Sequence, residues 1–285
     1  MTAFKSLNKT SFDDIYLAFK EAFKDYEMQL NKDELQLMLK RRGFVPDLSF
    51  GAFEKDRLVA FTFNGIGTYQ GLKTAYDTGT GTLEEYRGQG LATRVFEYSM
   101  PYLKKAGIQQ YLLEVLQHNP KAISVYEKLG FKISREFNYF VQEQEKADLK
   151  TKPLDPSYQI QPVVIDNDLC IAAFWDFTPS WQNDFDAIKR KGGDFKMMGA
   201  FHKNRLIGYC ILETQSGDLT QIAVDMPYRR LGIGSHMLRE IVKYNQHPSI
   251  KVINTDITCT SIVDFLESRS IPLSGKQFEM VLRID

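Results

Sequence analysis

Residues 86–92 read Tyr86-Arg87-Gly88-Gln89-Gly90-Leu91-Ala92, and residues 228–234 repeat the pattern as Tyr228-Arg229-Arg230-Leu231-Gly232-Ile233-Gly234. Each stretch follows a predicted strand and opens a predicted amphipathic helix. The start of a helix exposes unpaired backbone N–H groups and the positive end of the helix dipole. Because Gly and Ala leave that backbone accessible, both stretches predict a loop that binds a pyrophosphate. A glycine-rich turn without a ligand is the alternative, and its recurrence at two equivalent places argues against it.

A polar stretch between the two loops predicts a domain boundary. Residues 141–157 are polar and contain Pro153 and Pro156, a composition typical of linkers. A chain of 285 residues is also long for one domain and comfortable for two. We therefore expect an N-terminal domain at 1–145, a linker at 146–157 and a C-terminal domain at 158–285.

The same order of elements is predicted on both sides of this boundary. In the first half we expect helices at 12–23 and 31–42, strands at 48–53, 58–63 and 73–82, a helix at 90–105, a strand at 110–116, a helix at 120–129 and a strand at 131–140. In the second half we expect helical segments within 167–190, strands at 194–201, 206–213 and 219–224, a helix at 232–244, a strand at 250–256, a helix at 262–267 and a strand at 276–284. This order predicts two tandem copies of one mixed α/β fold.

Composition narrows the classes of function. Lys+Arg and Asp+Glu both total 36, so the chain lacks the basic surplus of most nucleic-acid-binding proteins. The cysteines, Cys170, Cys210 and Cys259, are far apart and form no metal-binding or disulfide pattern. No signal peptide or membrane-spanning apolar run is recognisable. These features predict a cytoplasmic protein without a metal, nucleic-acid or membrane partner.

Both loops resemble the acetyl-CoA pyrophosphate loop of the GNAT superfamily of N-acetyltransferases, Arg/Gln-x-x-Gly-x-Gly/Ala. The first half carries a second signature similar to that superfamily: Glu114-Val115-Leu116-Gln117-His118-Asn119-Pro120-Lys121-Ala122-Ile123-Ser124-Val125-Tyr126-Glu127-Lys128-Leu129-Gly130-Phe131. The resemblance implies two tandem GNAT-like acyl-CoA N-acyltransferase domains. It also implies direct transfer of the acetyl group from acetyl-CoA to a primary amine of a small molecule or peptide, without a metal.

The resemblance further implies roles for residues of the first half. Those expected to bind acetyl-CoA are Thr80, Thr82, Arg87, Gly88, Gln89, Gly90, Leu91, Ala92 and Asn119. Tyr126 is expected to protonate the departing CoA thiolate, because both groups titrate in a similar range. Two simpler interpretations stay open: Asn119 only caps the helix that begins at Pro120, and Tyr126 is a core aromatic residue.

The general base is not identified by the sequence. Asp77 and Glu114 lie on or beside the strands expected to flank the acetyl group, whereas Glu84 and Glu85 are expected to face solvent. A water relay is a further alternative. The aromatic-rich first segment lines an acceptor pocket or packs in the core; its members are Phe12, Phe19, Phe23, Tyr26 and Met28.

The second half keeps the loop but departs from the later signature. A possible second CoA site comprises Val224, Arg229, Arg230, Gly232, Ile233 and Gly234. Counting along the later helix places Thr258 where Asn119 stands and Phe265 where Tyr126 stands, and phenylalanine cannot donate a proton. We therefore expect a second domain that has lost the catalytic tyrosine. A CoA-binding sensor or scaffold protein is the alternative function for the whole chain.

Overall fold

The computed structural model describes residues 2–25, 29–165 and 171–284. The chain forms two compact units: unit 1 comprises Met1–Arg135 with Phe278–Asp285, and unit 2 comprises Glu136–Gln277. These bounds differ from the expected domains 1–145 and 158–285, because the end of the chain belongs to unit 1 and residues 136–145 belong to unit 2. The last strand starts in unit 2 and ends in unit 1 beside β5.

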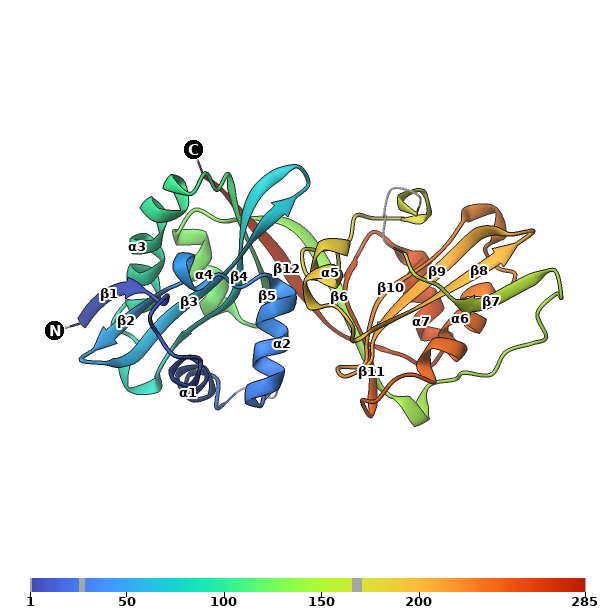
Figure 1. Cartoon of the computed structure of the whole chain (residues 1–285), viewed down its shortest axis with the longest axis horizontal. Helices are drawn as coiled ribbons and strands as arrows, with labels where there is room; N and C mark the ends of the chain where they lie inside the picture. The colour runs from blue at the N-terminus through green and yellow to red at the C-terminus, as the bar shows by residue number, and fades with distance from the viewer. Residues whose placement is uncertain (1, 26–28, 166–170, 285) are drawn as a thin grey trace. The chain divides into compact units, whose positions relative to one another are not determined.

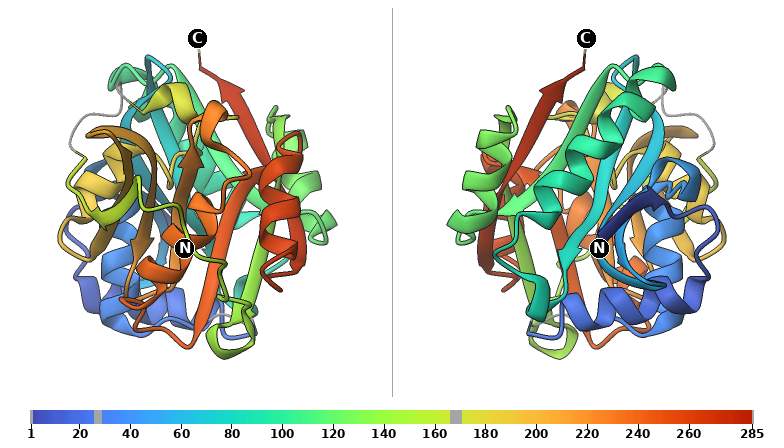
Figure 2. Two further views of the ribbon diagram at one scale, coloured as in Figure 1. Left: turned by 90° about the vertical axis from the view of Figure 1, so that its right-hand side faces the viewer. Right: turned by 90° about the vertical axis from the view of Figure 1, so that its left-hand side faces the viewer.

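Unit 1 contains a sheet with the strand order β1-β2-β3-β4-β5-β12, in which β4 and β5 run parallel (Figure 1). Figure 2 shows α3, in blue-green, on the strands of this unit. The elements are β1 (Thr2–Ser6), α1 (Phe12–Ala22), α2 (Lys32–Arg42), η1 (Pro46–Leu48), β2 (Phe50–Glu54), β3 (Arg57–Tyr69), β4 (Leu72–Thr82), η2 (Glu84–Tyr86), α3 (Leu91–Lys105), β5 (Gln110–Leu116) and α4 (Pro120–Lys128). The strand β6 (Lys132–Glu143) follows; it starts in unit 1 and continues into unit 2.

Local signals explain where the first helices begin and what they bury. Ser11 caps α1, and Asn31 and Glu34 form a capping box at the start of α2. Phe12, Phe19 and Phe23 are partly buried and pack against the core, as expected for core residues; the alternative that they line an acceptor pocket stays a prediction. Tyr26 and Met28 lie outside the described residues.

Unit 2 contains a sheet with the strand order β6-β11-β10-β9-β8-β7. Its remaining elements are η3 (Gln144–Lys146), β7 (Tyr158–Pro162), η4 (Ala172–Phe174), α5 (Phe185–Lys191), β8 (Phe195–His202), β9 (Arg205–Glu213), β10 (Asp218–Val224), η5 (Met226–Tyr228), α6 (Ile233–Val242), β11 (Ser249–Asp256), α7 (Thr260–Glu267) and β12 (Leu273–Arg283). No helix among the described residues is long and apolar enough to span a membrane.

The prediction of helical segments within 167–190 is confirmed, although these segments are short. Only η4 and α5 are helical there, and residues 166–170, with Cys170, lie outside the described residues. Pro179 disfavours a helical conformation for the residue before it, and Asp184 starts α5 by accepting a hydrogen bond from the Ala187 N–H. The intervening chain is therefore irregular.

In each unit two parallel strands separate after a short region of pairing. β4 and β5 pair only from Thr74–Tyr76 with residues 110–112, and β10 pairs with β11 only at Asp218 and Lys251. Register shifts in the antiparallel pairing fall at Thr78 of β4, between the partners Asp77 and Gly79, and at Thr220 of β10, between the partners Leu219 and Gln221. Such bulges bend a strand. We call the region beyond the end of the parallel pairing, toward the glycine loop of each unit, the gap.

Candidate functional site

The loop of unit 1 has the conformation that an anion-binding helix start requires. Gly88 and Gly90 have φ values of 78° and 70°, which favour glycine. A Cβ atom added at either position would meet no atom within 4 Å, so the space beside the loop is open. Gly90 provides no side chain to cap α3, which leaves the first-turn N–H groups available to a phosphate. Leu91 is buried beneath this turn.

The side chain of Arg87 fixes the loop of unit 1 to the elements beside it. Its Nε donates to the Thr82 carbonyl oxygen at 3.3 Å, and its Nη2 donates to the Ala22 carbonyl oxygen at 2.9 Å. Asp25 lies 3.6 Å from Nη1. Arg87 therefore joins the end of α1 to the end of β4, and Thr82 contributes its carbonyl to that arrangement.

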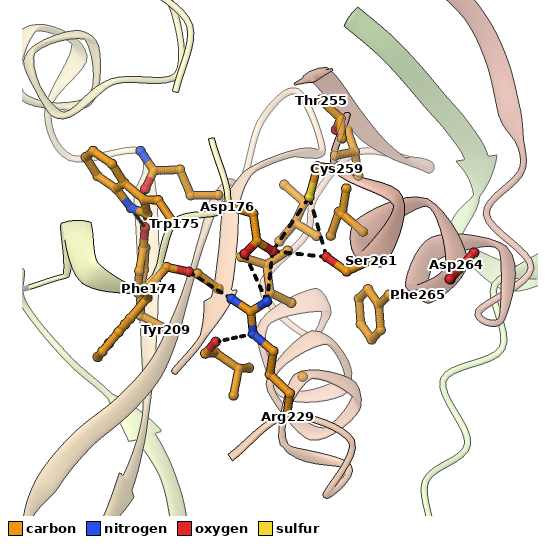
Figure 3. A pocket seen from close by; sticks show the side chains of 18 of the residues that line it. Phe174, Trp175, Asp176, Tyr209, Arg229, Thr255, Cys259, Ser261, Asp264 and Phe265 are labelled. Atoms are coloured by element: carbon orange, nitrogen blue, oxygen red, sulfur yellow. Dashed lines mark hydrogen bonds and ion pairs between the residues drawn. The ribbon is translucent and has the colours of Figure 1, made fainter. Parts of the chain in front are cut away.

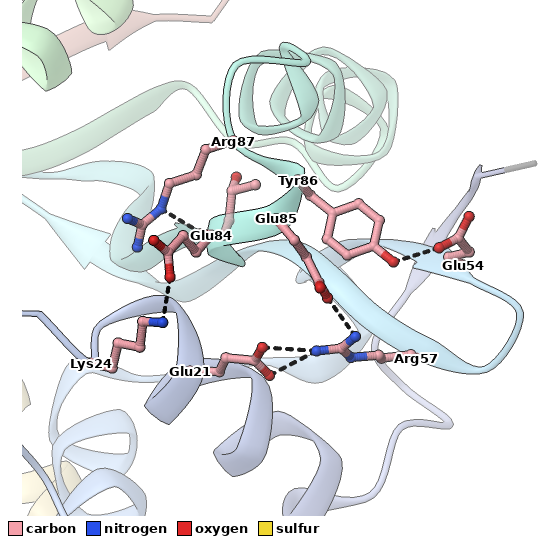
Figure 4. Close-up of polar contacts among 9 residues, drawn as sticks. Glu21, Lys24, Glu54, Arg57, Glu84, Glu85, Tyr86 and Arg87 are labelled. Atoms are coloured by element: carbon pink, nitrogen blue, oxygen red, sulfur yellow. Dashed lines mark hydrogen bonds and ion pairs between the residues drawn. The ribbon is translucent and has the colours of Figure 1, made fainter.

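The acidic residues before the loop are exposed but paired, as Figure 4 shows. Glu84 pairs with Lys24, and Glu85 pairs with Arg57. Arg57 also donates to both carboxylate oxygens of Glu21, at 2.8 and 3.0 Å. These contacts hold η2 against α1, and they leave Glu84 and Glu85 away from the gap between β4 and β5.

The gap in unit 1 brings together an acid and a tyrosine that are 49 positions apart in the sequence. The Tyr126 hydroxyl donates to Asp77 Oδ2 at 3.4 Å. Thr80 Oγ1 donates to the same oxygen at 2.8 Å, and the Gly79 N–H donates to Oδ1 at 2.8 Å. Burial raises the pKa of Asp77 to about 6, although these three donors act to lower it. The carboxyl group can thus change its charge near neutral pH.

A small cavity of about 20 Å³ lies at this pair. Its wall includes the expected residues Thr80, Ala92 and Tyr126, together with Asp77, Phe96 and Tyr111. Sequence analysis did not single out Tyr111, whose hydroxyl donates to the buried Asn64 side chain. Tyr111 lies in the apolar strand β5, and nothing in the sequence around it indicated that it lies close to Asp77.

The other expected residues of unit 1 have more ordinary surroundings. Asn119 Oδ1 accepts from the Ala122 N–H at 3.2 Å, so Asn119 caps α4; its expected contact with CoA stays a prediction. Gln89 is exposed. Glu114 lies near Tyr76, whose pKa is raised by burial and then by this carboxylate.

Unit 2 contains a much larger cavity, of about 970 Å³, shown in Figure 3. It runs along the loop, the ends of β10 and β11 and the start of α7. All residues of the predicted second site line it: Val224, Arg229, Arg230, Gly232, Ile233 and Gly234.

Arg229 orders the unit 2 loop as Arg87 orders the loop of unit 1. Its Nε donates to the Val224 carbonyl oxygen at 2.8 Å, and its Nη2 donates to the Phe174 carbonyl oxygen at 3.2 Å. Nη1 lies 2.9 and 3.0 Å from the two carboxylate oxygens of Asp176 (Figure 3). Val224 and Arg229 are thus the counterparts of Thr82 and Arg87.

The start of α7 corrects the predicted counterparts of Asn119 and Tyr126. The Asn119 N–H donates to the carbonyl of the last residue of β5, and the Cys259 N–H donates to that of the last residue of β11. Cys259 is therefore the counterpart of Asn119, and Leu266 that of Tyr126. The predicted counterparts, Thr258 and Phe265, each lie one residue before the correct position, because the N-cap of α7 is Cys259 and not Thr258. The conclusion that this unit lacks the tyrosine is unaffected.

The bulges identify the counterpart of Asp77 in the same way. Thr78 and Thr220 are the bulged residues, and each lies nine positions before its loop arginine. The residue before Thr220 is Leu219, which is buried and lines the unit 2 cavity. Unit 2 therefore has a leucine in place of each member of the Asp77–Tyr126 pair.

Known proteins with similar sequences include enzymes that acetylate α-amino groups. N-alpha-acetyltransferase 30 from Schizosaccharomyces pombe is 32% identical over 131 residues, which cover 41% of this chain and 87% of that protein. An N-alpha-acetyltransferase from Saccharolobus solfataricus is 40% identical over 73 residues, 25% of this chain and 44% of that protein.

Solved structures show the same tandem fold. A tandem GNAT protein from the clavulanic acid biosynthesis pathway aligns over 100% of this chain and 99% of its own, with a TM-score of 0.76 and 11% identity. The sequence model of the acetyltransferase (GNAT) family matches residues 11–131 and 163–260, and the second match ends where α7 begins. The chain therefore belongs to the acetyltransferase (GNAT) family and is an acetyl-CoA-dependent N-acetyltransferase built from two GNAT units.

Proposed function

We propose that unit 1 carries out the transfer and that its acceptor is the α-amino group of a peptide or protein. The observation that carries the first part is the contact between Tyr126 and Asp77 in the gap between β4 and β5. The second part is supported by the N-alpha-acetyltransferases that this chain resembles over part of its length.

The open loop of unit 1 fits the diphosphate of acetyl-CoA, which supplies the thioester that the amine attacks. The uncapped start of α3 offers N–H groups at one end of the site, and the gap between the strands leads from there to Asp77 and Tyr126. Positioning and charge stabilisation account for most of the rate in such a direct transfer. In this proposal the loop before α3 binds acetyl-CoA, and Asp77 and Tyr126 transfer the protons.

Asp77 and Tyr126 divide the proton transfers between them. With its pKa raised to about 6, Asp77 is mostly ionised at neutral pH and accepts a proton from the incoming amine. The Tyr126 hydroxyl, 3.4 Å away, protonates the departing thiolate. Thr80 and the Gly79 N–H hold the carboxylate in place.

Cavity size alone would favour unit 2 as the site of chemistry. Proton transfer needs an acid and a base, however, and the counterparts of both in unit 2 are leucines. We therefore assign the transfer to unit 1, whose own cavity of about 20 Å³ has room for little more than a water molecule.

Turnover measurements on the full chain test the assignment. Tyr126→Phe should lower kcat about 10²-fold or more and leave the KM for acetyl-CoA within about twofold, because only proton donation is lost. Tyr102→Phe, on the exposed part of α3, is the control, and it should change neither kcat nor the KM for acetyl-CoA. Unchanged kcat in Tyr126→Phe would remove Tyr126 from the mechanism.

The acceptor is tested separately with matched peptides. With a peptide that has a free α-amino group, the enzyme should convert acetyl-CoA to free CoA and acetylate the peptide N-terminus. Mass spectrometry of the peptide measures the added acetyl group. The same peptide with a blocked N-terminus and a free lysine is the control. Acetylation of the lysine alone would contradict the α-amino part of the proposal and leave the role of Tyr126 intact.

A further inference from the structure

The end of α2 in unit 1 is bonded directly to β3. α2 ends at Arg42, and Gly43 follows in the left-handed conformation, with a φ of 80°. Beyond this turn the Val45 N–H donates to the Asn64 carbonyl oxygen, and the Ile66 N–H donates to the Gly43 carbonyl oxygen, both at 2.9 Å. These bonds fix the end of α2 against β3.

The approach of α2 to β3 is close enough to require glycine. A Cβ atom added at Gly65 would lie 1.9 Å from the Arg42 carbonyl oxygen, a distance that real Cβ atoms do not show. Gly65 pairs with Tyr76 of β4, and Asn64 pairs with Asp77. The backbone of Arg42 is therefore one strand away from the residue that we assign as the base.

The side chain of Arg42 reaches the bulge of β4. Its Nη1 donates to the Thr78 carbonyl oxygen at 3.2 Å, and Thr78 Oγ1 donates to the Phe63 carbonyl oxygen at 3.2 Å. Thr78 is 2% exposed, so both bonds hold a buried part of the chain. Asp77 precedes Thr78, and Gly79 follows it. Arg42 thus fixes the backbone between the carboxyl group and the N–H that donates to it.

Arg42 also places a positive charge near the Asp77 carboxyl. Burial raises the pKa of Asp77 to about 6, and the guanidinium acts against this rise, together with the three hydrogen bonds described above. A nearby cation stabilises the ionised carboxylate. Arg42 therefore favours the form of Asp77 that accepts a proton from the amine.

The titratable groups described next to Asp77 are acids. Tyr76 precedes it in β4, Tyr111 lines the same small cavity from β5, and Tyr126 is hydrogen-bonded to it from α4. Burial raises the pKa of Tyr76 and Tyr111 well above the usual range, so both hydroxyls are uncharged near pH 6. Glu114 of β5 lies near Tyr76, where its carboxylate acts in the opposite sense to the charge at the end of α2. The guanidinium is thus the positive charge in this group of side chains.

Unit 2 uses the corresponding helix end differently. α5 precedes β8 as α2 precedes β2, and it ends at Lys191 before Gly192, whose φ is also 80°. Lys191 pairs with Glu213 at the end of β9, and both side chains are 4% exposed. Leu219, and not a carboxyl group, precedes the bulge of this unit. The cation that ends the helix therefore belongs to a buried ion pair in unit 2, whereas Arg42 lies beside the site of unit 1.

We propose that Arg42 is a positioning residue for the transfer in unit 1. It holds the bulge at Thr78 so that the Asp77 carboxyl faces Tyr126, and it keeps a positive charge beside that carboxyl. Arg42 acts through Asp77 and takes no proton itself, because a guanidinium stays charged at the pH of the reaction. The inference rests on the proposed role of Asp77 as the base.

The pH dependence of kcat/KM in the full chain, with the free-amine peptide described above, tests this role. Arg42→Met, which removes the charge and the bond to Thr78, should move the rise of kcat/KM to higher pH by about half a unit. It should also lower kcat at pH 8 about tenfold and leave the KM for acetyl-CoA within about twofold. Arg42→Lys restores the charge and should return the rise to its wild-type pH, with kcat partly recovered. Lys40→Met removes an exposed positive charge from the same turn of α2; it is the control and should change none of these quantities.

A double-mutant cycle separates positioning from a general effect on the fold. In the Asp77→Asn background, Arg42→Met should lower kcat less than about twofold, because the group through which Arg42 acts is gone. An equal loss of about tenfold in both backgrounds would overturn the inference. Arg42→Gln removes the charge but keeps a donor for the Thr78 carbonyl, so it should show the same pH shift with a smaller loss of kcat. It carries the test if thermal unfolding shows that Arg42→Met is not folded.

The outcomes distinguish this inference from the proposed function. If the rise near pH 6 persists in Asp77→Asn, another group is the base, and both the proposal for Asp77 and the inference for Arg42 are refuted. If Asp77→Asn removes the rise while Arg42→Met and Arg42→Gln leave it at the wild-type pH, Asp77 remains the base and only the role of Arg42 is refuted.

Discussion

Replacement of Asp77 by asparagine should stabilise the protein in a way that depends on pH. Burial raises the pKa of Asp77 from about 3.8 to about 6. Because the folded state holds this proton more tightly than the unfolded state, wild-type stability from this group is complete below about pH 4 and is lost as the pH rises through 6. A shift of about two units corresponds to about 3 kcal/mol above pH 7. This is an upper limit, since Asp77 keeps some contact with solvent.

The hydrogen bonds of Asp77 add an offset that does not vary with pH. Asparagine can still accept from the Gly79 N–H, and its NH₂ group can donate to the hydroxyls of Thr80 and Tyr126, which also act as acceptors. The diagnostic quantity is therefore the change in the stability difference between pH 4 and pH 8.

Urea unfolding of wild type and Asp77→Asn at intervals from pH 4 to pH 8 measures that change. The variant should gain up to about 3 kcal/mol relative to wild type over this range, with most of the gain between pH 4 and pH 7. Asp56→Asn, in the exposed turn between β2 and β3, is the control for carboxylate loss alone. A stability difference for Asp77→Asn that is flat with pH would show that the carboxyl is not held at a raised pKa, and the general-base argument would lose its support.

Three further outcomes follow from the same structure. The kcat/KM of wild type should rise with pH through an apparent pKa near 6 as Asp77 ionises, and a rise in the same place in Asp77→Asn would assign it to another group. Gly90→Val should weaken acetyl-CoA binding at least tenfold, whereas Gly71→Val, which imposes a similar backbone strain in the β3–β4 turn, should not; equal binding losses would point to misfolding. Glu279→Ala should cost about 3–5 kcal/mol in urea unfolding, because it leaves the Arg135 guanidinium without its buried carboxylate, and a loss below about 1 kcal/mol would contradict a structural role for the pair.

Local sequence signals were sufficient for most helices and for both loops. The predicted starts and ends of α1, α2, α3 and α4 agree with the structure within one residue, because caps and apolar spacing act within a single element. β1 and β7 were missed. Both are short, and their partners β2 and β8 lie elsewhere in the chain, so their own residues carry little of the signal.

The candidate site was only partly visible for a related reason. Asp77 and Tyr126 were each singled out, but their contact depends on the pairing of β4 with β3, which produces the bulge at Thr78, and on where α4 packs, and both are set by residues distant in the sequence. The one-residue error at α7 was an error of counting from the preceding strand, and no side chain marked the true N-cap position, because Cys259 makes no side-chain capping hydrogen bond. Likewise, nothing within residues 278–285 indicated that they complete unit 1.

The two units provide an internal comparison that separates binding from chemistry. Both keep a glycine loop clamped by an arginine, which donates to a carbonyl at the end of the preceding strand. Only unit 1 has a carboxyl group and a tyrosine at these two positions, Asp77 and Tyr126. Burial of a carboxylate lowers the stability of the fold, and a leucine at the same position avoids this loss. A carboxylate is therefore expected there only where function requires it. The joint presence of Asp77 and Tyr126 in one unit, and of Leu219 and Leu266 in the other, is what we expect if the two groups act together in transfer while the loop serves a ligand in both.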